Sequence, residues 1–306
     1  MKIQQKTIRI GEIGIFNVDI PLTIVGTGSP KVLVVANQHG GEYSGLFVIK
    51  ELISKLKSKP IAGQFIFLSS PNPFGQIMAL RNEPLDGADL NRMYPGNPKK
   101  NLPSRLAHAI FSLAKSCDAV VDLHTFSRQT AIIGVLTVGG KAEARSRALL
   151  RSFGPDAVWR IDVSQAEDSP FSSCLDTALG KIDIPAIGIE MPRFEWITPK
   201  EVKRVASGII RLVQALGSGK TISLSTIPTY AVTSIFSEKA GIFTPARTPL
   251  MKMRKGEMLG TITSLVDYTH TRVTAPRAGT LITLRGHDVL RTGSKLGSIG
   301  TDQEKL

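Results

Sequence analysis

The chain has 306 residues, of which 42% are apolar and 21% charged, and it carries a formal net charge of +13. This balance is that of a folded globular chain of one or two domains, and it excludes an intrinsically disordered protein. Because no apolar run reaches about 18 residues, the sequence also excludes a membrane-spanning helix, and we expect no membrane partner.

The N-terminus, the cysteines and the basic residues indicate location and partners. The segment MKIQQKTIRIGEIGIF has neither a long apolar core nor a small-residue cleavage site, so we expect a cytoplasmic protein. Cys117 and Cys174 form no Cys-x-x-Cys pair and are expected to be reduced. The lysines and arginines are spread along the chain without interleaved aromatic residues, which predicts no nucleic-acid partner. The positive charge is compatible with an anionic small-molecule substrate. The sequence is compatible with a homo-oligomer as well as with a monomer.

Residues 1–222 alternate between strand and helix patterns. Apolar runs predict strands at 32–36, 64–69, 118–123, 131–138 and 185–190, and helical spacing predicts helices at 42–57, 103–115, 141–152 and 198–216. The last helix has Thr198 as N-cap, Glu201 completing a capping box and Gly217 as its expected stop. This alternation predicts a layered α/β domain with helices on both faces of its sheet.

The segment VVANQHGGEYSG, residues 34–45, places a histidine and a glutamate directly after a buried strand. His39 and Glu42 share one face if a helical turn begins there, and the two intervening glycines permit a tight turn close to a bound group. This stretch could therefore bind a metal ion, provided that another part of the chain supplies a third coordinating residue. His124 supplies it, because it follows the apolar strand 118–123, and the carboxyl ends of strands in layered sheets bind ligands. Two histidines and one glutamate form a catalytic zinc set with a position left for water.

Two further segments carry polar residues that packing does not explain. Residues 71–96 are polar and long for a loop, and they contain Arg81, Asn91 and Arg92. An arginine offers a bidentate fork for a carboxylate and can stabilise an oxyanion beside a metal. Glu190 closes the apolar strand 185–190, and a carboxylate in such a place can act as general base and then as general acid.

The composition changes near residue 220. Residues 217–226 read as a linker, and the chain beyond them has short strands broken by glycine and proline. Two Lys/Arg-x-Gly turns, at 254–256 and 291–293, lie in two segments with similar sequence patterns. This pattern predicts a small all-β barrel-sandwich module with related hairpins at 223–306, after a catalytic domain at 1–222.

The motifs NQHGGEYSG, DGADLNRMYPG, VVDLHT and AIGIEMPR occur in this order, and together they resemble the succinylglutamate desuccinylase/aspartoacylase family. The resemblance covers roughly residues 20–300 and implies a zinc-carboxypeptidase-like mixed sheet flanked by helices. It implies that one Zn²⁺ per chain is bound by His39, Glu42 and His124, and that Glu190 is the catalytic carboxylate. Arg81 would polarise the scissile carbonyl, and Asn91 with Arg92 would hold a substrate carboxylate. Asp122, on the same strand face as His124, is expected to orient a ligand histidine.

The resemblance therefore implies a zinc-dependent amidohydrolase that cleaves a small N-acyl amino acid with a zinc-activated water. Gly41 stands where many relatives carry aspartate, but this is not a ligand position. A metallocarboxypeptidase acting on short peptides is one alternative. A non-catalytic metal- or ligand-binding protein on a hydrolase scaffold is another, and it would be expected to lack one of the key residues.

Overall fold

The computed structural model describes residues 2–126, 131–162, 171–220 and 226–306. The helices are α1 (Ser44–Ser58), α2 (Pro73–Met78), η1 (Leu90–Arg92), α3 (Leu102–Ala114), α4 (Glu143–Phe153), α5 (Leu175–Lys181) and α6 (Pro199–Ser218). The first nine strands are β1 (Ile3–Ile13), β2 (Phe16–Thr27), β3 (Lys31–Ala36), β4 (Gly63–Leu68), β5 (Ala119–Thr125), β6 (Ile133–Val138), β7 (Ala157–Asp162), β8 (Ala186–Met191) and β9 (Pro228–Phe236). The others are β10 (Gly241–Pro245), β11 (Lys252–Met253), β12 (Met258–Thr263), β13 (His270–Thr274), β14 (Gly279–Leu284), β15 (Asp288–Leu290) and β16 (Lys295–Lys305).

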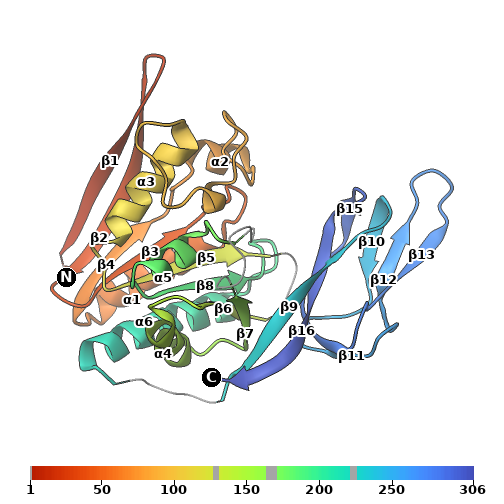
Figure 1. Cartoon of the computed structure of the whole chain (residues 1–306). Helices are drawn as coiled ribbons and strands as arrows, with labels where there is room; N and C mark the ends of the chain where they lie inside the picture. The colour runs from red at the N-terminus through yellow and green to blue at the C-terminus, as the bar shows by residue number, and fades with distance from the viewer. Residues whose placement is uncertain (1, 127–130, 163–170, 221–225) are drawn as a thin grey trace.

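A mixed sheet forms the centre of the molecule (Figure 1). Its strand order is β1-β2-β4-β3-β5-β8-β6-β7-β9-β16-β14-β11. Strands β4, β3, β5 and β8 run parallel, whereas β6 is antiparallel to β8 and parallel to β7. The parallel strands are nearly continuous apolar runs because helices cover them on both sides. The large mixed α/β sheet predicted from the sequence is confirmed.

Two apolar clusters lie on opposite faces of this sheet. One contains residues of α1, α4 and α6, for example Leu52, Phe153 and Leu212, packed against the strands. The other contains residues of α3 and α5, for example Leu106 and Leu179. The helices cover the faces but leave the carboxyl ends of β3, β5 and β8 to be closed by loops, which is where polar groups can gather.

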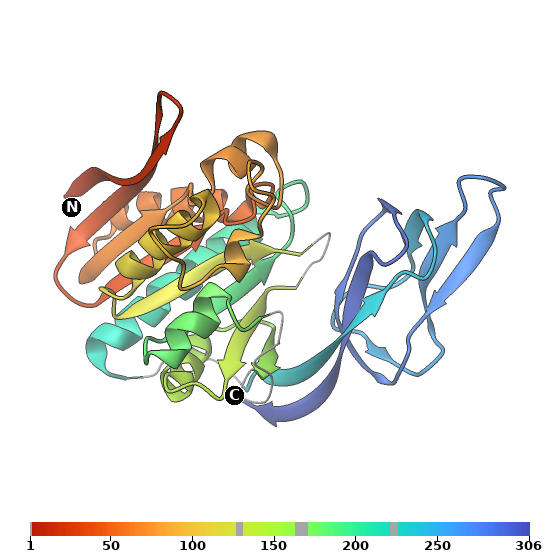
Figure 2. The same cartoon turned by 45° about the horizontal axis from the view of Figure 1, so that its top comes forward.

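The C-terminal strands stand to one side of the main body in both views (Figures 1 and 2). Strands β9, β16, β14 and β11 continue the large sheet, and β13, β12, β10 and β15 form a second sheet. An apolar cluster that includes Phe243, Leu259 and Leu281 lies among these strands. The predicted related turns both contain a glycine with positive φ, Gly256 at 83° and Gly293 at 81°.

Some details differ from the sequence-based prediction. The capping box of Thr198 and Glu201 is present, but the predicted stop at Gly217 is wrong, because α6 continues to Ser218 and ends at the left-handed Gly219. The prediction also missed β1 and β2, which are partly exposed and lack a continuous apolar run, and β7, whose buried residues are interrupted by Arg160. Residues 221–225 of the predicted linker lie outside the described residues. No described helix is long and apolar enough to cross a membrane.

Candidate active site

The segment after β3 is a single turn that precedes α1. The backbone N–H of Glu42 donates to the carbonyl of His39 at 3.0 Å, and the helix begins two residues later at Ser44. Gly40 is needed for close packing rather than for an unusual backbone conformation. A Cβ atom at this position would lie 2.0 Å from the backbone carbonyl carbon of Gly75 in α2. The structure therefore gives Gly40 a packing reason that the sequence did not indicate.

Neighbouring parallel strands supply the second histidine and the second glutamate. Strand β5 contains His124, and its register partner in β8 is Glu190. Strand β3, which carries His39 just beyond its end, lies on the other side of β5. The carboxyl ends of β3, β5 and β8 thus bring together residues that are far apart in the sequence.

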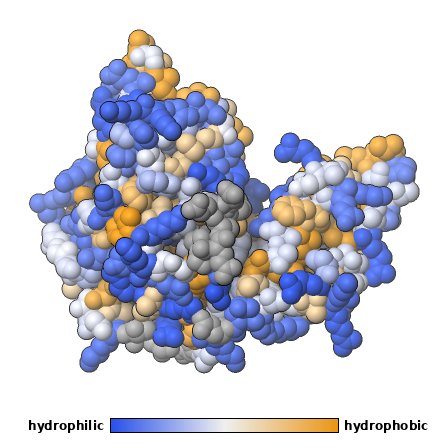
Figure 3. All heavy atoms as spheres, viewed as in Figure 1, coloured by the Kyte–Doolittle hydropathy of each residue, from blue (hydrophilic) through white to orange (hydrophobic). Residues whose placement is uncertain are grey.

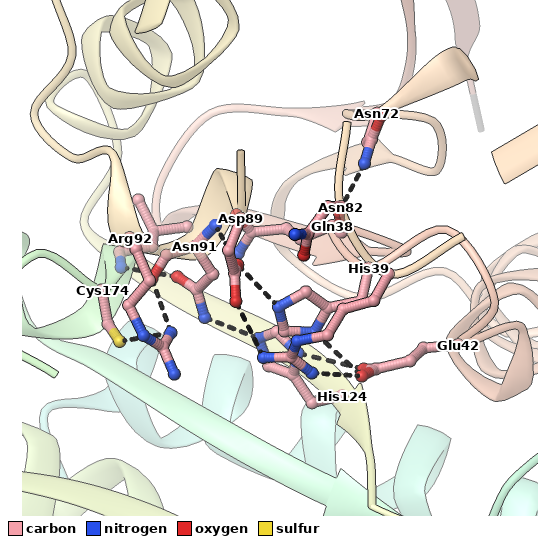
Figure 4. A network of polar contacts seen from close by, with 12 residues as sticks. Gln38, His39, Glu42, Asn72, Asn82, Asp89, Asn91, Arg92, His124 and Cys174 are labelled. Carbon is pink, nitrogen blue, oxygen red and sulfur yellow. Dashed lines mark hydrogen bonds and ion pairs between the residues drawn. The ribbon is translucent and has the colours of Figure 1, made fainter. Parts of the chain in front are cut away.

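The two histidines point toward the same carboxylate (Figure 4). His39 Nδ1 lies 2.8 Å from Glu42 Oε1, and His124 Nδ1 lies 3.1 Å from Glu42 Oε2. The two imidazole rings are 4.9 Å apart, measured between centroids. One ligand atom from each of His39, Glu42 and His124 lies within 4.8 Å of the others, so these three residues could hold a metal ion.

The Nε2 atom of each histidine, on the far side of the ring from Glu42, contacts a further carboxylate. His39 Nε2 lies 3.0 Å from Asp89 Oδ1, and His124 Nε2 lies 2.8 Å from Asp122 Oδ2. Carboxylates accept hydrogen bonds, so Asp89 and Asp122 favour a proton on each outer nitrogen. Each Nδ1 atom faces Glu42 and can act as a metal ligand once it gives up its own proton. A buried relay supports Asp122, because Gln38 donates from Nε2 to its Oδ2 at 2.6 Å and Tyr94 donates to Gln38 Oε1 at 2.5 Å.

The electrostatics of the cluster favour a positive charge at its centre. Burial lowers the pKa of His124, but the charges and hydrogen bonds of Asp122 and Glu42 outweigh burial and raise it well above 6.5. Burial likewise lowers the pKa of His39, and Glu42 and Asp89 reverse the effect. Burial raises the pKa of Glu42, but the two histidines hold it well below its usual range.

This donor set fits a zinc ion. With Asp89 and Asp122 fixing the outer protons, two Nδ1 lone pairs and the Glu42 carboxylate face one another. These groups repel each other unless a proton or a cation lies between them. Nitrogen and carboxylate donors in this number are those of catalytic zinc sites, which keep one position for water or substrate.

Of the predicted loop residues, Arg81 and Asn91 lie against the group formed by His39, Glu42 and His124. Arg81 Nη2 donates to Asp89 Oδ2 at 2.9 Å, and its Nη1 lies 3.6 Å from Glu42 Oε1. Asn91 Nδ2 lies 3.2 Å from His124 Nε2, and Asn91 Oδ1 accepts from the backbone of Leu175 at 2.9 Å. The Asn91 amide therefore also fixes the start of α5.

Arg92 is oriented by contacts with Asn91, Cys174 and Phe171. Its Nη1 donates to the Asn91 carbonyl at 2.8 Å and lies 3.1 Å from Cys174 Sγ, and its guanidinium stacks at 5.2 Å over the Phe171 ring. The two predicted arginines thus have different surroundings. Arg81 is half exposed beside the carboxylates, whereas Arg92 lies against an aromatic ring.

Glu190 is a partly buried residue with one buried and unused carboxylate oxygen. Among the residues that the structure describes, its Oε2 atom has no hydrogen-bond partner. Burial raises the pKa of Glu190, Glu42 raises it further, and His124 and Lys295 partly offset these effects. A carboxylate of this kind can accept a proton more readily than an exposed one, which is what a general base requires.

The candidate site opens into a cavity of roughly 320 Å³. His39, Glu42 and Arg81 line it on one side, and Arg285 and Asp288 from the C-terminal strands line it on the other. The molecular surface is hollowed between the main body and these strands (Figure 3). A cavity of this volume suits a small molecule.

Sequence reasoning missed several residues of the site. Asp89 stands two residues before Asn91, in a polar loop where a carboxylate could have been suspected as a partner of a ligand histidine. Gln38 immediately precedes His39, but nothing in the sequence links it to Asp122. Arg285 and Lys295 have no local signal, because only the packing of the C-terminal strands brings Arg285 to the cavity and Lys295 near Glu190.

Solved structures share this fold. The product-bound ectoine utilization protein EutE (DoeB) from Ruegeria pomeroyi is 20% identical, with a TM-score of 0.84 over 98% of this chain and 95% of that one. A succinylglutamate desuccinylase/aspartoacylase from Rhodobacter sphaeroides is 23% identical, with a TM-score of 0.82 over 99% of this chain and 96% of that one. The mixed sheet and its flanking helices therefore share the fold of these proteins.

The sequence comparison specifies the family. Residues 28–216 match the succinylglutamate desuccinylase/aspartoacylase catalytic domain, so the chain belongs to this family of deacylases. It is 33% identical to the N-alpha-acetyl-L-2,4-diaminobutyric acid deacetylase of Halomonas elongata over 197 residues. The matched part is 62% of this chain and 56% of the relative, so the chain spans little more than half of that protein's length.

Proposed function

We propose that this chain is a zinc-dependent deacylase that hydrolyses the amide bond of a small N-acyl amino acid. The observation that carries the proposal is the convergence of His39, Glu42 and His124, with Asp89 and Asp122 behind the histidines. His39, Glu42 and His124 would hold the zinc ion through two Nδ1 atoms and one carboxylate. When bound, zinc would lower the pKa of a water to about 7 and polarise the substrate carbonyl.

Glu190 is assigned as the general base. Its Cα lies opposite that of His124 on the neighbouring strand, and its Oε2 has no partner among the described residues. The carboxylate would take a proton from the attacking water and pass it to the amine that departs. The raised pKa of Glu190 suits this double role, because a weakly acidic carboxyl group both accepts and returns a proton readily.

The loop residues would orient the substrate. Arg81 lies half exposed beside Glu42, where it can donate to the carbonyl oxygen as negative charge develops. Arg92 would bind the α-carboxylate of the amino acid, and Asn91 would assist by donating from Nδ2. Asp122 and Asp89 would keep the two histidines in the required tautomer.

A substrate panel tests the proposal. N-acetyl, N-succinyl and N-formyl amino acids, together with N-α-acetyl-2,4-diaminobutyrate, would be assayed with zinc and with a chelator. Release of the free amine that stops on chelation and returns with zinc is the expected result. One zinc per chain by metal analysis is expected in the same sample. Absence of zinc-dependent turnover with every substrate would contradict the proposal.

Two alternatives are separated by the same panel. A metallocarboxypeptidase would hydrolyse dipeptides and leave the N-acyl amino acids intact. A non-catalytic binding protein would bind zinc without turnover, but an oriented base beside the metal-binding group speaks against it. The modest cavity, walled on one side by the C-terminal strands, favours a deacylase over a peptidase.

We further infer that the C-terminal strands form a barrel-sandwich module of residues 223–306, distinct from a catalytic domain of residues 1–222. Its support is the separate apolar cluster that includes Phe243 and Leu281. In this arrangement the module acts as a wall of the substrate cavity.

A further inference from the structure

Residues 82–88 form a short surface loop between Arg81 and Asp89 of the candidate active site. Leu85 in this loop is exposed, whereas Glu83 is fully buried and is the only buried residue of the loop. Burying a carboxylate costs free energy unless strong hydrogen bonds replace its hydration. The burial of Glu83 must therefore be explained by the groups that its carboxylate contacts.

Both oxygens of the Glu83 carboxylate accept hydrogen bonds from the backbone of the same loop. Oε1 accepts from the N–H of Leu85 at 3.0 Å, and Oε2 accepts from the N–H of Asp86 at 2.9 Å. A further bond, from Asn82 Nδ2 to the Gly87 carbonyl at 2.8 Å, spans the loop. Hydrogen bonds to a charged acceptor are roughly twice as strong as neutral ones, so the carboxylate fixes the conformation of this exposed segment.

The same loop is closed at its base, next to the candidate active site. The N–H of Glu83 donates to the carbonyl of Ala88 at 2.9 Å. Just outside this bond, Arg81 Nη2 donates to Asp89 Oδ2 at 2.9 Å. The other oxygen of Asp89 lies 3.0 Å from His39 Nε2 (Figure 4). A continuous series of contacts therefore leads from the buried Glu83 to the outer nitrogen of a proposed metal ligand.

We propose that Glu83 is a positioning residue for Asp89. Its carboxylate fixes the loop, and the fixed loop keeps Asp89 in contact with His39. The proposal rests on the proposed function and adds to it a residue that does not line the cavity. Without the Glu83 carboxylate, Asp89 is still present, but the segment that carries it adopts other conformations. The Nε2 proton of His39 then lacks its acceptor for part of the time.

Replacing Glu83 with glutamine tests the proposal with the smallest change in shape. The new NH₂ group cannot accept from the N–H of Leu85 or of Asp86, so the loop loses one bond and the charge behind the other. We expect hydrogen exchange of these two amides, measured by NMR, to become about tenfold faster. Zinc affinity, measured by competition with a chromophoric chelator, should fall about 3- to 10-fold, which is less than for removal of an outer carboxylate itself.

A second measurement requires no zinc. In the metal-free protein, NMR follows the Nε2 proton of His39, and its exchange with water should become about 3- to 10-fold faster in Glu83→Gln, because Asp89 protects it less. Glu257→Gln is the matched control. Glu257 Oε2 also accepts from a backbone N–H, that of Arg254 at 2.7 Å, in a turn that does not line the cavity. Its substitution should change neither the His39 exchange nor the zinc affinity.

Double-mutant cycles separate positioning from a general loss of stability. In an Asp89→Ala protein the contact with His39 is absent, so adding Glu83→Gln should change zinc affinity by less than about twofold. In an Asp122→Asn protein the contact between Asp89 and His39 remains. The effect of about 3- to 10-fold should therefore persist in full in that background.

Three results would overturn the proposal. If exchange of the loop amides is unchanged in Glu83→Gln, the carboxylate does not fix the loop. If those amides exchange faster but the His39 proton does not, the loop does not position Asp89. If Glu83→Gln weakens zinc binding equally with and without the Asp89 carboxylate, it acts through stability alone. A protein in which the His39 proton responds as expected, but which binds no zinc or hydrolyses no amide, would contradict the proposed function alone.

Discussion

Replacing Asp122 with asparagine tests whether the carboxylate behind His124 controls metal affinity. Asp122 Oδ2 accepts from His124 at 2.8 Å and from Gln38 at 2.6 Å, whereas its Oδ1 has no partner among the described residues. An asparagine can place its oxygen at the Oδ2 position and keep both bonds, but without the charge. A hydrogen bond to a charged group contributes about 1–1.5 kcal/mol more than a neutral one. We therefore expect Asp122→Asn to weaken zinc binding about tenfold, and Asp122→Ala up to about 100-fold.

The assay is zinc competition against a chromophoric chelator, with thermal unfolding of the metal-free variants as a check on folding. Asp118→Asn serves as the matched control, because Asp118 stands just before the opposite end of β5 and accepts from the backbone of Lys31 at 2.7 Å. It should leave zinc affinity unchanged. If Asp122→Asn and Asp122→Ala both fold and bind zinc as tightly as the unmodified protein, the argument that Asp122 orients His124 is refuted.

Three other predictions concern catalysis, pH and packing. Glu190→Gln should keep zinc but lower kcat about 10²- to 10⁴-fold, since a general base is lost; near-normal turnover in a zinc-loaded variant would exclude that role. Because the pKa values of His39 and His124 are raised above 6.5, protons should compete with zinc at higher pH than for ordinary histidines. Zinc affinity should fall as the pH is lowered, and the midpoint of this fall should lie above pH 6.5. Titration calorimetry at several pH values measures this midpoint, and a midpoint at or below pH 6.5 would contradict the argument. Gly40→Ala should lower the free energy of unfolding by about 1–3 kcal/mol, because its Cβ would collide with Gly75, whereas Gly180→Ala, with open space around it, should not. Denaturant unfolding measures both, and equal stability of the two variants would contradict the packing argument.

The sequence by itself determined the central strands and the polar residues at their ends. The apolar runs that became β3, β5 and β8 are readable because a strand covered on both faces needs apolar side chains throughout. Residues that interrupt such runs at a strand end, such as His124 and Glu190, stand out against that background. The capping box of Thr198 and Glu201 was readable for a similar reason, since it involves neighbours in the chain.

Only the tertiary structure decided which of these residues meet and what holds them. The pairing of His39 with Asp89, and the relay from Tyr94 through Gln38 to Asp122, join positions that are separated by 50 or more residues. The approach of Lys295 to Glu190 depends on how β16 packs beside β9 and β14. Local patterns record burial and backbone conformation, because these act on neighbouring residues. Contacts between distant side chains follow from strand order and sheet packing, which no short stretch of the sequence encodes.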